Sequence, residues 1–288
     1  MAITTSTPGV KEVPEMVQVL TDWLADAPSV RLHPGDVGWY CRFGVPHTAA
    51  ALRTWSRAGE VMAIGLLDGP DELRLGFAPH ALRDEALARR IARDAAAPRR
   101  GVLPAGTACV AAPPGALVRD LLAHDGWSDG ESWAPLHREL TGSVPDAGVR
   151  IDVVGPEQAP ERTAVQRSAF PGSTFTVDRW HAMADSAPYA TARCLLARDE
   201  AGEPVAAATV WSAGEGRPGL IEPLGVRADR RGLGHGRAIA RAAARALREL
   251  GASSAVVRTP MSNTAAIATY RSAGFGPLPE HTDLRREG

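Results

Sequence analysis

A glycine-rich turn, Arg231-Gly232-Leu233-Gly234-His235-Gly236, is the stretch of the sequence best suited to hold a ligand. The apolar run before it, residues 220–226, has the length of a buried strand. After it, residues 237–250 place Ile239, Ala243 and Leu247 on one stripe and arginines on another, which predicts an amphipathic helix. Such a turn directs backbone N–H groups and the positive end of the helix dipole at one point. The sequence therefore predicts a phosphate or pyrophosphate site here.

Spacing separates the phosphate-binding motifs that this turn could represent. A P-loop ends in Gly-Lys-Ser/Thr, whereas Gly236 is followed by Arg237 and Ala238. The dinucleotide motif G-x-G-x-x-G fails as well, because its third glycine would fall on Arg237 or Ile239. The pattern that fits is R-x-x-G-x-G at residues 231–236, which resembles the acetyl-CoA loop of the GNAT superfamily of N-acetyltransferases. For the turn taken alone, a plain glycine-rich connection between strand and helix is the alternative.

A second motif lies downstream of the turn. Residues 252–259 read as another strand, and the helix expected after them ends at Gly274. The pattern N-x-x-A-x-x-x-Y-x-x-x-G-F, from Asn263 to Phe275, resembles the second signature of the same family. Asn263 and Tyr270 stand seven residues apart, close to two helical turns, so both side chains are expected to face one site. Read singly, Asn263 is also a suitable helix cap and Tyr270 a suitable core residue.

The resemblance implies that acetyl-CoA is the co-substrate and lies between two parting strands at residues 224–226 and 255–257. Its pyrophosphate is expected on the backbone of the glycine turn. A backbone N–H near Gly225 or Val226 is expected to stabilise the oxyanion of the tetrahedral intermediate. The implied cofactor contacts are Leu224, Gly225, Val226, Arg231, Gly232, Leu233, Gly234, His235, Gly236, Arg237, Asn263 and Tyr270.

Two residues are the candidates for proton transfer. Glu222 stands four residues before Val226, where similar enzymes often have a carboxylate, and is the candidate base for the acceptor ammonium. A structural glutamate on the strand is its alternative reading, and the adjoining Pro223 indicates a strand edge or bulge. Tyr270 is the candidate acid that protonates the departing CoA thiolate.

The two halves of the chain share an order of motifs. Gly126-Trp127 corresponds to Gly274-Phe275, and the strand end at residues 75–77 corresponds to residues 224–226. We therefore expect an α/β protein of two tandem GNAT-like units, residues 1–143 and 149–288, each a mixed, mostly antiparallel sheet flanked by helices. A polar linker at residues 141–148 is expected to join them.

The first unit lacks the residues that the chemistry requires. In place of the glycine turn it has Asp84 and Glu85 at a predicted helix start, where carboxylates repel pyrophosphate. Its helix at residues 114–124 has neither asparagine nor tyrosine. The unit is therefore expected to be a degenerate copy that serves structure or shapes the substrate cleft. Within it, residues 37–43 read as a strand and residues 47–57 as a helix.

Two further expectations concern the second unit. Its aromatic residues Phe170, Phe175, Trp180 and Tyr189 would give an aromatic acceptor pocket, although core packing is the simpler reading of each. The segment after Phe275 is expected to close the sheet with a brief hairpin.

Composition limits the classes of partner. The net charge of −1 and the scattered basic residues argue against a nucleic-acid footprint. No apolar run approaches the ~18 residues of a membrane span, so a cytoplasmic location is expected. The three cysteines Cys41, Cys109 and Cys194 are far apart in sequence and indicate neither disulfides nor a zinc site, and we expect no metal.

These features predict an acyltransferase that moves an acetyl group from acetyl-CoA directly to a primary amine of a small molecule or peptide. The tandem arrangement also resembles mycothiol synthase, which is the named alternative for the reaction. A non-catalytic regulator that binds acyl-CoA is the alternative from another class of protein. The chain is expected to be a monomer or a homodimer.

Overall fold

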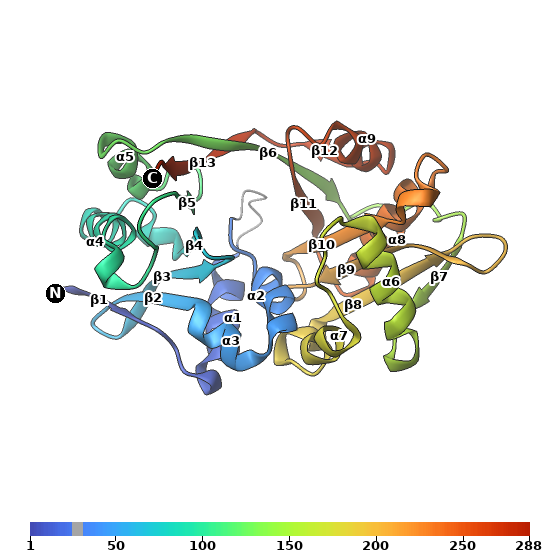
Figure 1. Ribbon diagram of the computed structural model, residues 1–288, viewed down its shortest axis with the longest axis horizontal. Coiled ribbons are helices and arrows are strands. Elements are labelled where there is room, and N and C mark those ends of the chain that lie inside the picture. The colour runs from blue at the N-terminus through green and yellow to red at the C-terminus, as the bar shows by residue number, and fades with distance from the viewer. Residues whose placement is uncertain (25–30) are drawn as a thin grey trace.

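The strands of both halves of the chain form one continuous sheet. In the computed structural model, which describes residues 1–24 and 31–288, this sheet has 13 strands, and helices cover both of its faces (Figure 1). The strand order is β1-β2-β3-β4-β5-β13-β6-β11-β10-β9-β8-β7, with β12 paired to β6. Most neighbouring strands are antiparallel, and the pairs β4–β5 and β10–β11 are parallel. This mixed α/β architecture was predicted.

The first half contributes strands and helices in the order strand, helices, three strands, helix, strand, helix, strand. Its elements are β1 Ile3–Ser6, α1 Val13–Trp23, α2 Pro34–Tyr40, α3 Val45–Ala51, β2 Leu52–Arg57, β3 Glu60–Leu67, β4 Glu72–Phe77, α4 Glu85–Ala96, β5 Ala108–Ala111, α5 Leu117–His124 and β6 Ser128–Glu139.

The second half repeats this order. Its elements are β7 Arg150–Val153, α6 Ala159–Ala169, α7 Val177–Ala184, β8 Ala192–Arg198, β9 Pro204–Trp211, β10 Pro218–Val226, α8 His235–Glu249, β11 Ser254–Pro260, α9 Thr264–Ser272, β12 Gly276–Pro277 and β13 His281–Arg286. Gly251 after α8 and Gly274 after α9 both have positive φ, as expected for the residues that end these helices.

Two sequence expectations for the first half are wrong. The segment at residues 37–43 is helical, because His33 caps α2 by accepting the N–H of Gly35 and Pro34 occupies its first turn. The helix expected at residues 47–57 ends at Ala51, and β2 follows at once. Thr54 and Trp55 of β2 are buried between the ladders that this strand forms with β1 and β3.

Each half gives its last long strand to the sheet of the other. β6 pairs with β11 of the second half, and β13 pairs with β5 of the first, while β6 and β13 also pair with each other. The segment after Phe275 therefore does not close its own sheet with a brief hairpin, as the sequence suggested. It crosses instead to the first half, and Figure 1 shows β6 and β13 running together along the top of both halves.

The strand β9 shows how the second half buries both faces of its sheet. Its alternate residues Ala206, Ala208 and Val210 pack in the core that contains α8. The residues between them, including Ala207 and Trp211, pack in the core that contains α6 and α7. Strict alternation of this kind places helices on both faces and holds α8, the helix after the glycine turn, against the sheet.

The two halves are in close contact where α2 meets Trp211. A Cβ added at Gly35 would lie 2.4 Å from the Cβ of Trp211, and one added at Gly38 would lie 2.4 Å from its Cζ3. Glycine is thus required at both positions for the helix of the first half to approach the indole of the second. Trp211 is 1% exposed, so this contact excludes water from the junction of the halves.

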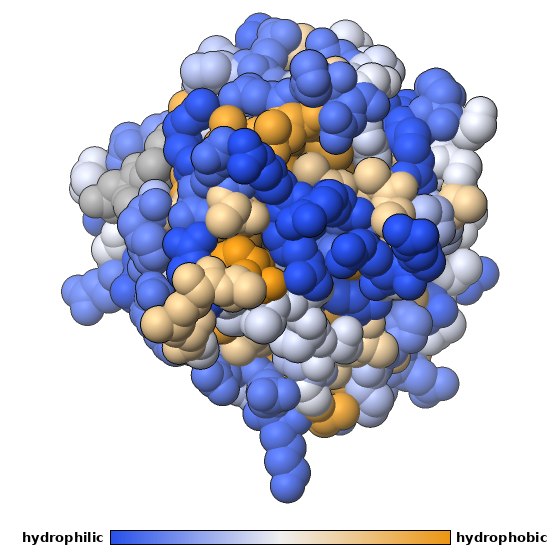
Figure 2. Space-filling view, turned by 90° about the vertical axis from the view of Figure 1, so that its left-hand side faces the viewer, coloured by the Kyte–Doolittle hydropathy of each residue, from blue (hydrophilic) through white to orange (hydrophobic). Residues whose placement is uncertain are grey.

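The outer edges of the sheet are short and polar. The edge strands β1 and β7 have four residues each, and Thr4, Ser6 and Arg150 are exposed on them. At the end where β1 and α4 lie, hydrophilic residues cover most of the surface and hydrophobic ones show in patches between them (Figure 2). Short polar edges of this kind disfavour further strand pairing with another molecule.

Candidate active site

The site begins where β10 and β11 separate. The two strands pair in parallel from Pro218↔Ser254 to Leu220↔Val256, and beyond Leu220 no further pairs join these two described strands. In the ladder of β10 with β9, the register shifts between Ile221 and Leu224, so β10 carries a bulge at Glu222 and Pro223. This bulge, which Pro223 indicated in the sequence, re-aims the end of β10 and leaves a gap between the strands.

The glycine turn follows directly after β10. Gly232 and Gly234 have φ of +77° and +87°, a backbone conformation that side chains with a Cβ rarely adopt. Within the described chain, no side chain caps the amino end of α8, which begins at His235. The first N–H groups of this helix therefore remain available to an anionic ligand.

Two contacts hold the turn against its surroundings. Arg231 donates from Nη2 to the carbonyl of Ala169 at 2.8 Å, which fixes the turn to the end of α6. A Cβ at Gly236 would lie 2.8 Å from Cγ2 of Thr269, so α8 and α9 approach closely only because this residue is glycine. The turn is thereby positioned by both neighbouring helices.

A cleft of about 850 Å³ runs along the turn and the gap between the strands. Of the residues predicted to contact the cofactor, those that line it are Leu224, Gly225, Val226, Arg231, Gly232, Leu233, Gly234, Gly236, Arg237, Asn263 and Tyr270. His235, also predicted, is the single member of that set not on the cleft wall in the described part of the chain. Leu233 is 64% exposed on the wall of the cleft.

Asn263 and Tyr270 both lie on the wall of this cleft. The Oδ1 of Asn263 accepts the N–H of Ala266 at 3.1 Å, so this residue is the cap of α9 as well as a lining residue. Tyr270 is 5% exposed and packs edge-on against Phe275, with ring centroids 5.6 Å apart. Both structural readings of the sequence thus hold, and both residues also lie on the cleft wall.

A second cavity, of about 250 Å³, adjoins the cleft at the junction of the two halves. It has walls from β10, β11 and α9 of the second half and from β4 of the first. Five residues line both spaces, namely Phe170, Leu224, Asn263, Ala266 and Tyr270. A ligand in the cleft and a ligand in the cavity would therefore meet beside Tyr270.

Glu222 faces this inter-unit cavity and is half-buried. Its backbone carbonyl accepts the indole N–H of Trp211 at 2.8 Å, which fixes the bulge of β10 to β9. Burial raises the pKa of the Glu222 carboxyl from its usual 4.5 to about 7, and the charge of Arg74 opposes that rise. A carboxyl with this pKa can exchange a proton near neutral pH.

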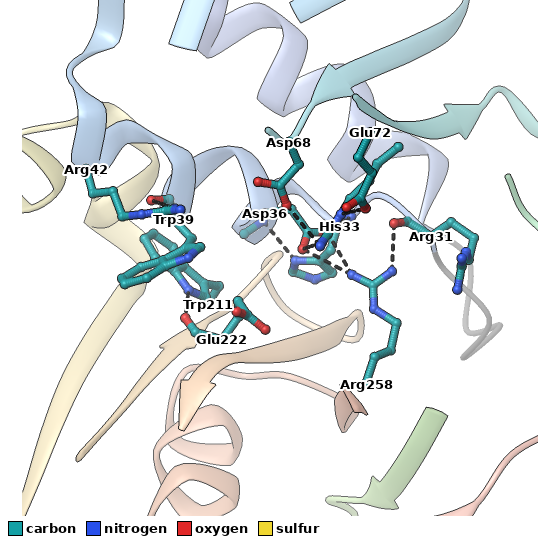
Figure 3. Close-up of polar contacts among 12 residues, drawn as sticks. Arg31, His33, Asp36, Trp39, Arg42, Asp68, Glu72, Trp211, Glu222 and Arg258 are labelled. Atoms are coloured by element: carbon teal, nitrogen blue, oxygen red, sulfur yellow. Dashed lines mark hydrogen bonds and ion pairs between the residues drawn. The ribbon is translucent and has the colours of Figure 1, made fainter. Parts of the chain in front are cut away.

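Charged residues of both halves meet beside Glu222, as Figure 3 shows. Asp36 of α2 accepts from Nη2 of Arg258 at 3.0 and 3.1 Å and from Nη1 of Arg74 at 3.3 Å. Burial alone would raise the pKa of Asp36, but the two guanidinium groups lower it below its ordinary value. Asp36 therefore stays ionised and joins β11 of the second half to α2 and β4 of the first.

The aromatic acceptor pocket expected from the sequence is only partly present. Phe170 is 37% exposed and lines both spaces. Phe175 and Trp180 are each 3% exposed and belong to the core under α6 and α7, and Tyr189 packs against the same core. Core packing is therefore the correct reading for these three residues. Phe175 is in addition covered by Trp39 of the first half, which stacks on it.

The start of α4 in the first half differs from that of α8 in the second. Asp84 caps α4 by accepting the N–H of Leu87 at 2.8 Å, and its carboxylate also binds Arg57 at 2.7 Å. The amino end that would receive a pyrophosphate is thus already occupied by a carboxylate. The carboxylate that the sequence placed at this helix start is therefore the cap of the helix.

Sequence reasoning missed the residues that the first half brings to the site. Asp36, Arg74 and Trp133 lie far from the motifs in sequence, and no local pattern marks them. Arg258 on β11 was within reach of sequence reasoning, because a charged residue in an otherwise apolar strand suggests a buried partner.

Among residues 1–24 and 31–288, no three His, Cys, Asp or Glu side chains gather as metal ligands would. The same residues include no helix that is long and apolar enough to cross a membrane. Cys41, Cys109 and Cys194 are all free thiols, and only Cys109 is not fully buried.

Comparison with known proteins assigns the family. Residues 162–275 match the model of the acetyltransferase (GNAT) family, a range that contains the glycine turn, Glu222 and Tyr270. These residues form a GNAT acetyltransferase domain. No curated protein matches the chain with significant similarity.

Solved structures extend the GNAT fold to the whole chain. A GCN5-related N-acetyltransferase from Sphaerobacter thermophilus is similar over 99% of this chain and 95% of its own, with a TM-score of 0.61 and 18% identity. A tandem GNAT protein from the clavulanic acid biosynthesis pathway matches over 99% and 98%, with a TM-score of 0.60 and 16% identity. An acetyltransferase of the GNAT family from Colwellia psychrerythraea matches over 100% and 99%, with a TM-score of 0.63 and 12% identity. These likenesses show that both units together form a tandem GNAT fold.

Proposed function

We propose that this acetyltransferase moves the acetyl group of acetyl-CoA directly to a primary amine, and that acetyl-CoA binds once per chain, in the second unit. The observation that carries this proposal is the junction of two spaces. The cleft on the glycine turn opens, beside Tyr270, into the cavity that holds Glu222.

The cleft is suited to acetyl-CoA at both ends. The uncapped first turn of α8 offers its N–H groups and its dipole to the pyrophosphate. Alternate residues of an antiparallel strand turn their N–H groups away from the partner strand, so one N–H among residues 224–226 points from β9 into the gap beside β11. That N–H is the donor for the thioester oxygen and would contribute about 3 kcal/mol to the stability of the oxyanion.

The proton transfers use the two groups at the junction. Glu222 takes a proton from the acceptor ammonium, directly or through a water, and the nitrogen lone pair then attacks the carbonyl carbon of the thioester. The C–N bond forms, the C–S bond breaks, and Tyr270 gives its phenolic proton to the departing thiolate. The acylated nitrogen then loses its extra proton, through water, to the Tyr270 phenolate, which leaves a neutral amide and CoA thiol. Burial, and then the charge of Glu222, raises the pKa of Tyr270, so the phenol carries its proton at neutral pH.

We further propose that the division into units falls at residues 1–143 and 149–288, with the first unit serving the acceptor site. The capped start of α4 supports this proposal, because the carboxylate of Asp84 already occupies the amino end that would receive a pyrophosphate. Its Glu72 and Arg74 nevertheless line the cavity that receives the acceptor. The first unit would thus act as a wall of the site and not as a second enzyme.

Calorimetric titration with acetyl-CoA, followed by mass spectrometry of an amine panel, tests the proposal. We expect one acetyl-CoA per chain and an acetylated amine among the products. Two binding sites per chain would contradict the assignment of the first unit. Binding without any acetylated product would favour a regulator that senses acyl-CoA.

A further inference from the structure

The inter-unit cavity contains three arginines whose charges are already neutralised by the protein. Each donor group of Arg74 contacts a different carboxylate: Nε reaches Glu72 at 2.8 Å, Nη2 reaches Asp68 at 2.9 Å and Nη1 reaches Asp36 at 3.3 Å. An arginine that binds a carboxylate or phosphate of a substrate needs two free parallel donors. All three nitrogens of Arg74 are already directed at carboxylates of the protein.

The other two arginines of the cavity are engaged as well. Arg258 donates both to Asp36 and, from Nη1, to the carbonyl of Arg31 at 2.6 Å. The terminal nitrogens of Arg31 contact Asp283 and His281. Its Nε has no hydrogen-bond partner among the described residues, but that atom is itself buried and so cannot reach a ligand in the cavity.

The carboxylates that line the cavity differ from its arginines, because they are not all in ion pairs with the described residues. Glu72 and Asp283 are paired with Arg74 and Arg31. Glu222 is the one lining carboxylate that forms no ion pair with any residue of the described ranges 1–24 and 31–288. Asp36 and Asp68 stand behind the lining arginines, so the carboxylates of this network outnumber its guanidinium groups. A cation is therefore favoured beside Glu222 and an anion is disfavoured there.

Apolar side chains form much of the remaining wall of the cavity, beside the polar Thr259, Asn263 and Tyr270. The apolar part includes Phe170, Ile221, Leu224, Val257 and Pro260, together with the ring of Trp133. The indole N–H of Trp133 is satisfied by Asp283 at 2.7 Å, so the ring offers only its hydrocarbon surface to a ligand. The volume of about 250 Å³ lies just below the ~300–1,000 Å³ usual for ligand pockets, which suits a small molecule.

We propose that the acceptor is a small primary amine with an apolar body and without a carboxylate or phosphate group. This inference rests on the proposed function and narrows the class of acceptor at the same site. The ammonium of the acceptor pairs with Glu222, and its body packs on the apolar wall. An acid group on the acceptor would have to displace Asp68, Glu72 or Asp36 from Arg74, or remain unpaired beside Glu222 in a largely buried site.

Matched pairs of amines test this directly. The pairs are 2-phenylethylamine with L-phenylalanine, and butylamine with norvaline, because the members of each pair differ only by a carboxylate. The readout is kcat/KM from the acetyl-CoA-dependent release of CoA thiol. We expect the amine without the carboxylate to be favoured by about 100-fold or more in each active pair, since a buried unpaired charge costs several kcal/mol.

A variant pair tests the reason for the preference. Asp68→Asn removes the partner of Nη2 of Arg74 and frees a donor toward the cavity, so the preference against the carboxylate should fall by about tenfold. Asp71→Asn is the matched control, because the side chain of Asp71 has no part in the network among the described residues. It should leave the preference unchanged.

The outcomes separate this inference from the proposed function. If calorimetry detects no binding of acetyl-CoA, the proposed function itself is wrong. If acetyl-CoA binds but the favoured acceptor carries a carboxylate or phosphate, the inference about the acceptor is overturned. It is also overturned if acetyl-CoA binds but no amine without an acid group is acetylated. The inference is supported if amines without an acid group are preferred and if Asp68→Asn weakens that preference.

Discussion

Tyr270 belongs to two environments at once. Its ring packs edge-on against Phe275 in the core of the second unit, and its side chain lines both the cofactor cleft and the inter-unit cavity. Tyr270→Phe keeps the ring and removes the proton. We expect unchanged acetyl-CoA affinity and thermal stability, with kcat reduced by about 100-fold.

Steady-state kinetics and thermal denaturation of the Tyr270→Phe variant measure the two effects separately. A smaller loss of kcat would mean that water replaces the phenol, because the CoA thiolate is a tolerable leaving group. A fall in melting temperature with kcat intact would show that Tyr270 serves packing alone.

Glu222 gives a pH dependence whose sign follows from its pKa. As the proposed base, Glu222 must be ionised to accept a proton. Burial raises the pKa of its carboxyl to about 7, and the charges of Asp36 and Asp68 also raise it, whereas the charges of Arg74 and Arg258 lower it. Activity should therefore be lost as the pH falls below about 7 and should level off above it.

Glu222→Gln removes this titration. We expect about a 100-fold loss at neutral pH, and the residual activity should keep rising with pH toward the amine pKa near ~10. The measurement is kcat/KM from about pH 5 to pH 9. A break near pH 7 that persists in the glutamine variant would assign the titration to another group.

In the proposed function, the glycine turn and α8 bind acetyl-CoA as one element. Gly234→Glu places a carboxylate at the amino end of α8, where it takes the position of the pyrophosphate. We expect acetyl-CoA binding to be lost, as measured by calorimetry, with only modest destabilisation. Backbone strain at φ of +87° should cost about 1 kcal/mol.

Gly202→Glu is the matched control for this variant. Gly202 has φ of +84° in the hairpin between β8 and β9, and, like Gly234, it has space for a side chain. The two substitutions should therefore cost similar folding stability, and only the one at Gly234 should remove binding. Loss of affinity in both variants would point to a general effect on folding.

The elements of the second unit could be predicted from sequence because their signals are local. Gly251 and Gly274 end their helices at positive φ, and Asn263 caps α9, so the boundaries follow from single residues. The wrong prediction of a strand at residues 37–43 also has a local cause. The start of α2 depends on His33 and Pro34, but the apolar residues after them were read as a strand.

The exchange of β6 and β13 could not be predicted in the same way. Strand pairing depends on long-range partners, and β13 carries no residue that distinguishes a return to its own unit from a crossing to the other. The motifs are local in sequence and therefore pointed to Glu222 and Tyr270. Asp36 and Arg74 enter the site only through the packing of the first unit, which no local motif records.

The molecule as a whole depends on the contact of α2 with Trp211. Gly38→Ala adds a Cβ 2.4 Å from Cζ3 of Trp211 in a buried junction. Overpacking typically costs about 1–3 kcal/mol, and the gain in helix propensity offsets about 1 kcal/mol of it. We expect a net loss of stability in urea denaturation and a lower kcat, because Trp211 holds the backbone of Glu222.

Gly35→Ala tests the same junction from the preceding turn of α2, because its Cβ would lie 2.4 Å from the Cβ of Trp211. Both variants should be destabilised. An increase in stability for either would mean that the two units adjust to each other more freely than this packing indicates.

The central claim is that the two units together form one catalytic site for acetyl transfer from acetyl-CoA to an amine. The time course of CoA thiol release by the full chain, with acetyl-CoA and a small amine such as 2-phenylethylamine, tests it most directly. We predict release that is continuous, requires the amine and is lost in Gly234→Glu. Acetyl-CoA that binds tightly but releases no thiol above the rate without amine would contradict the claim.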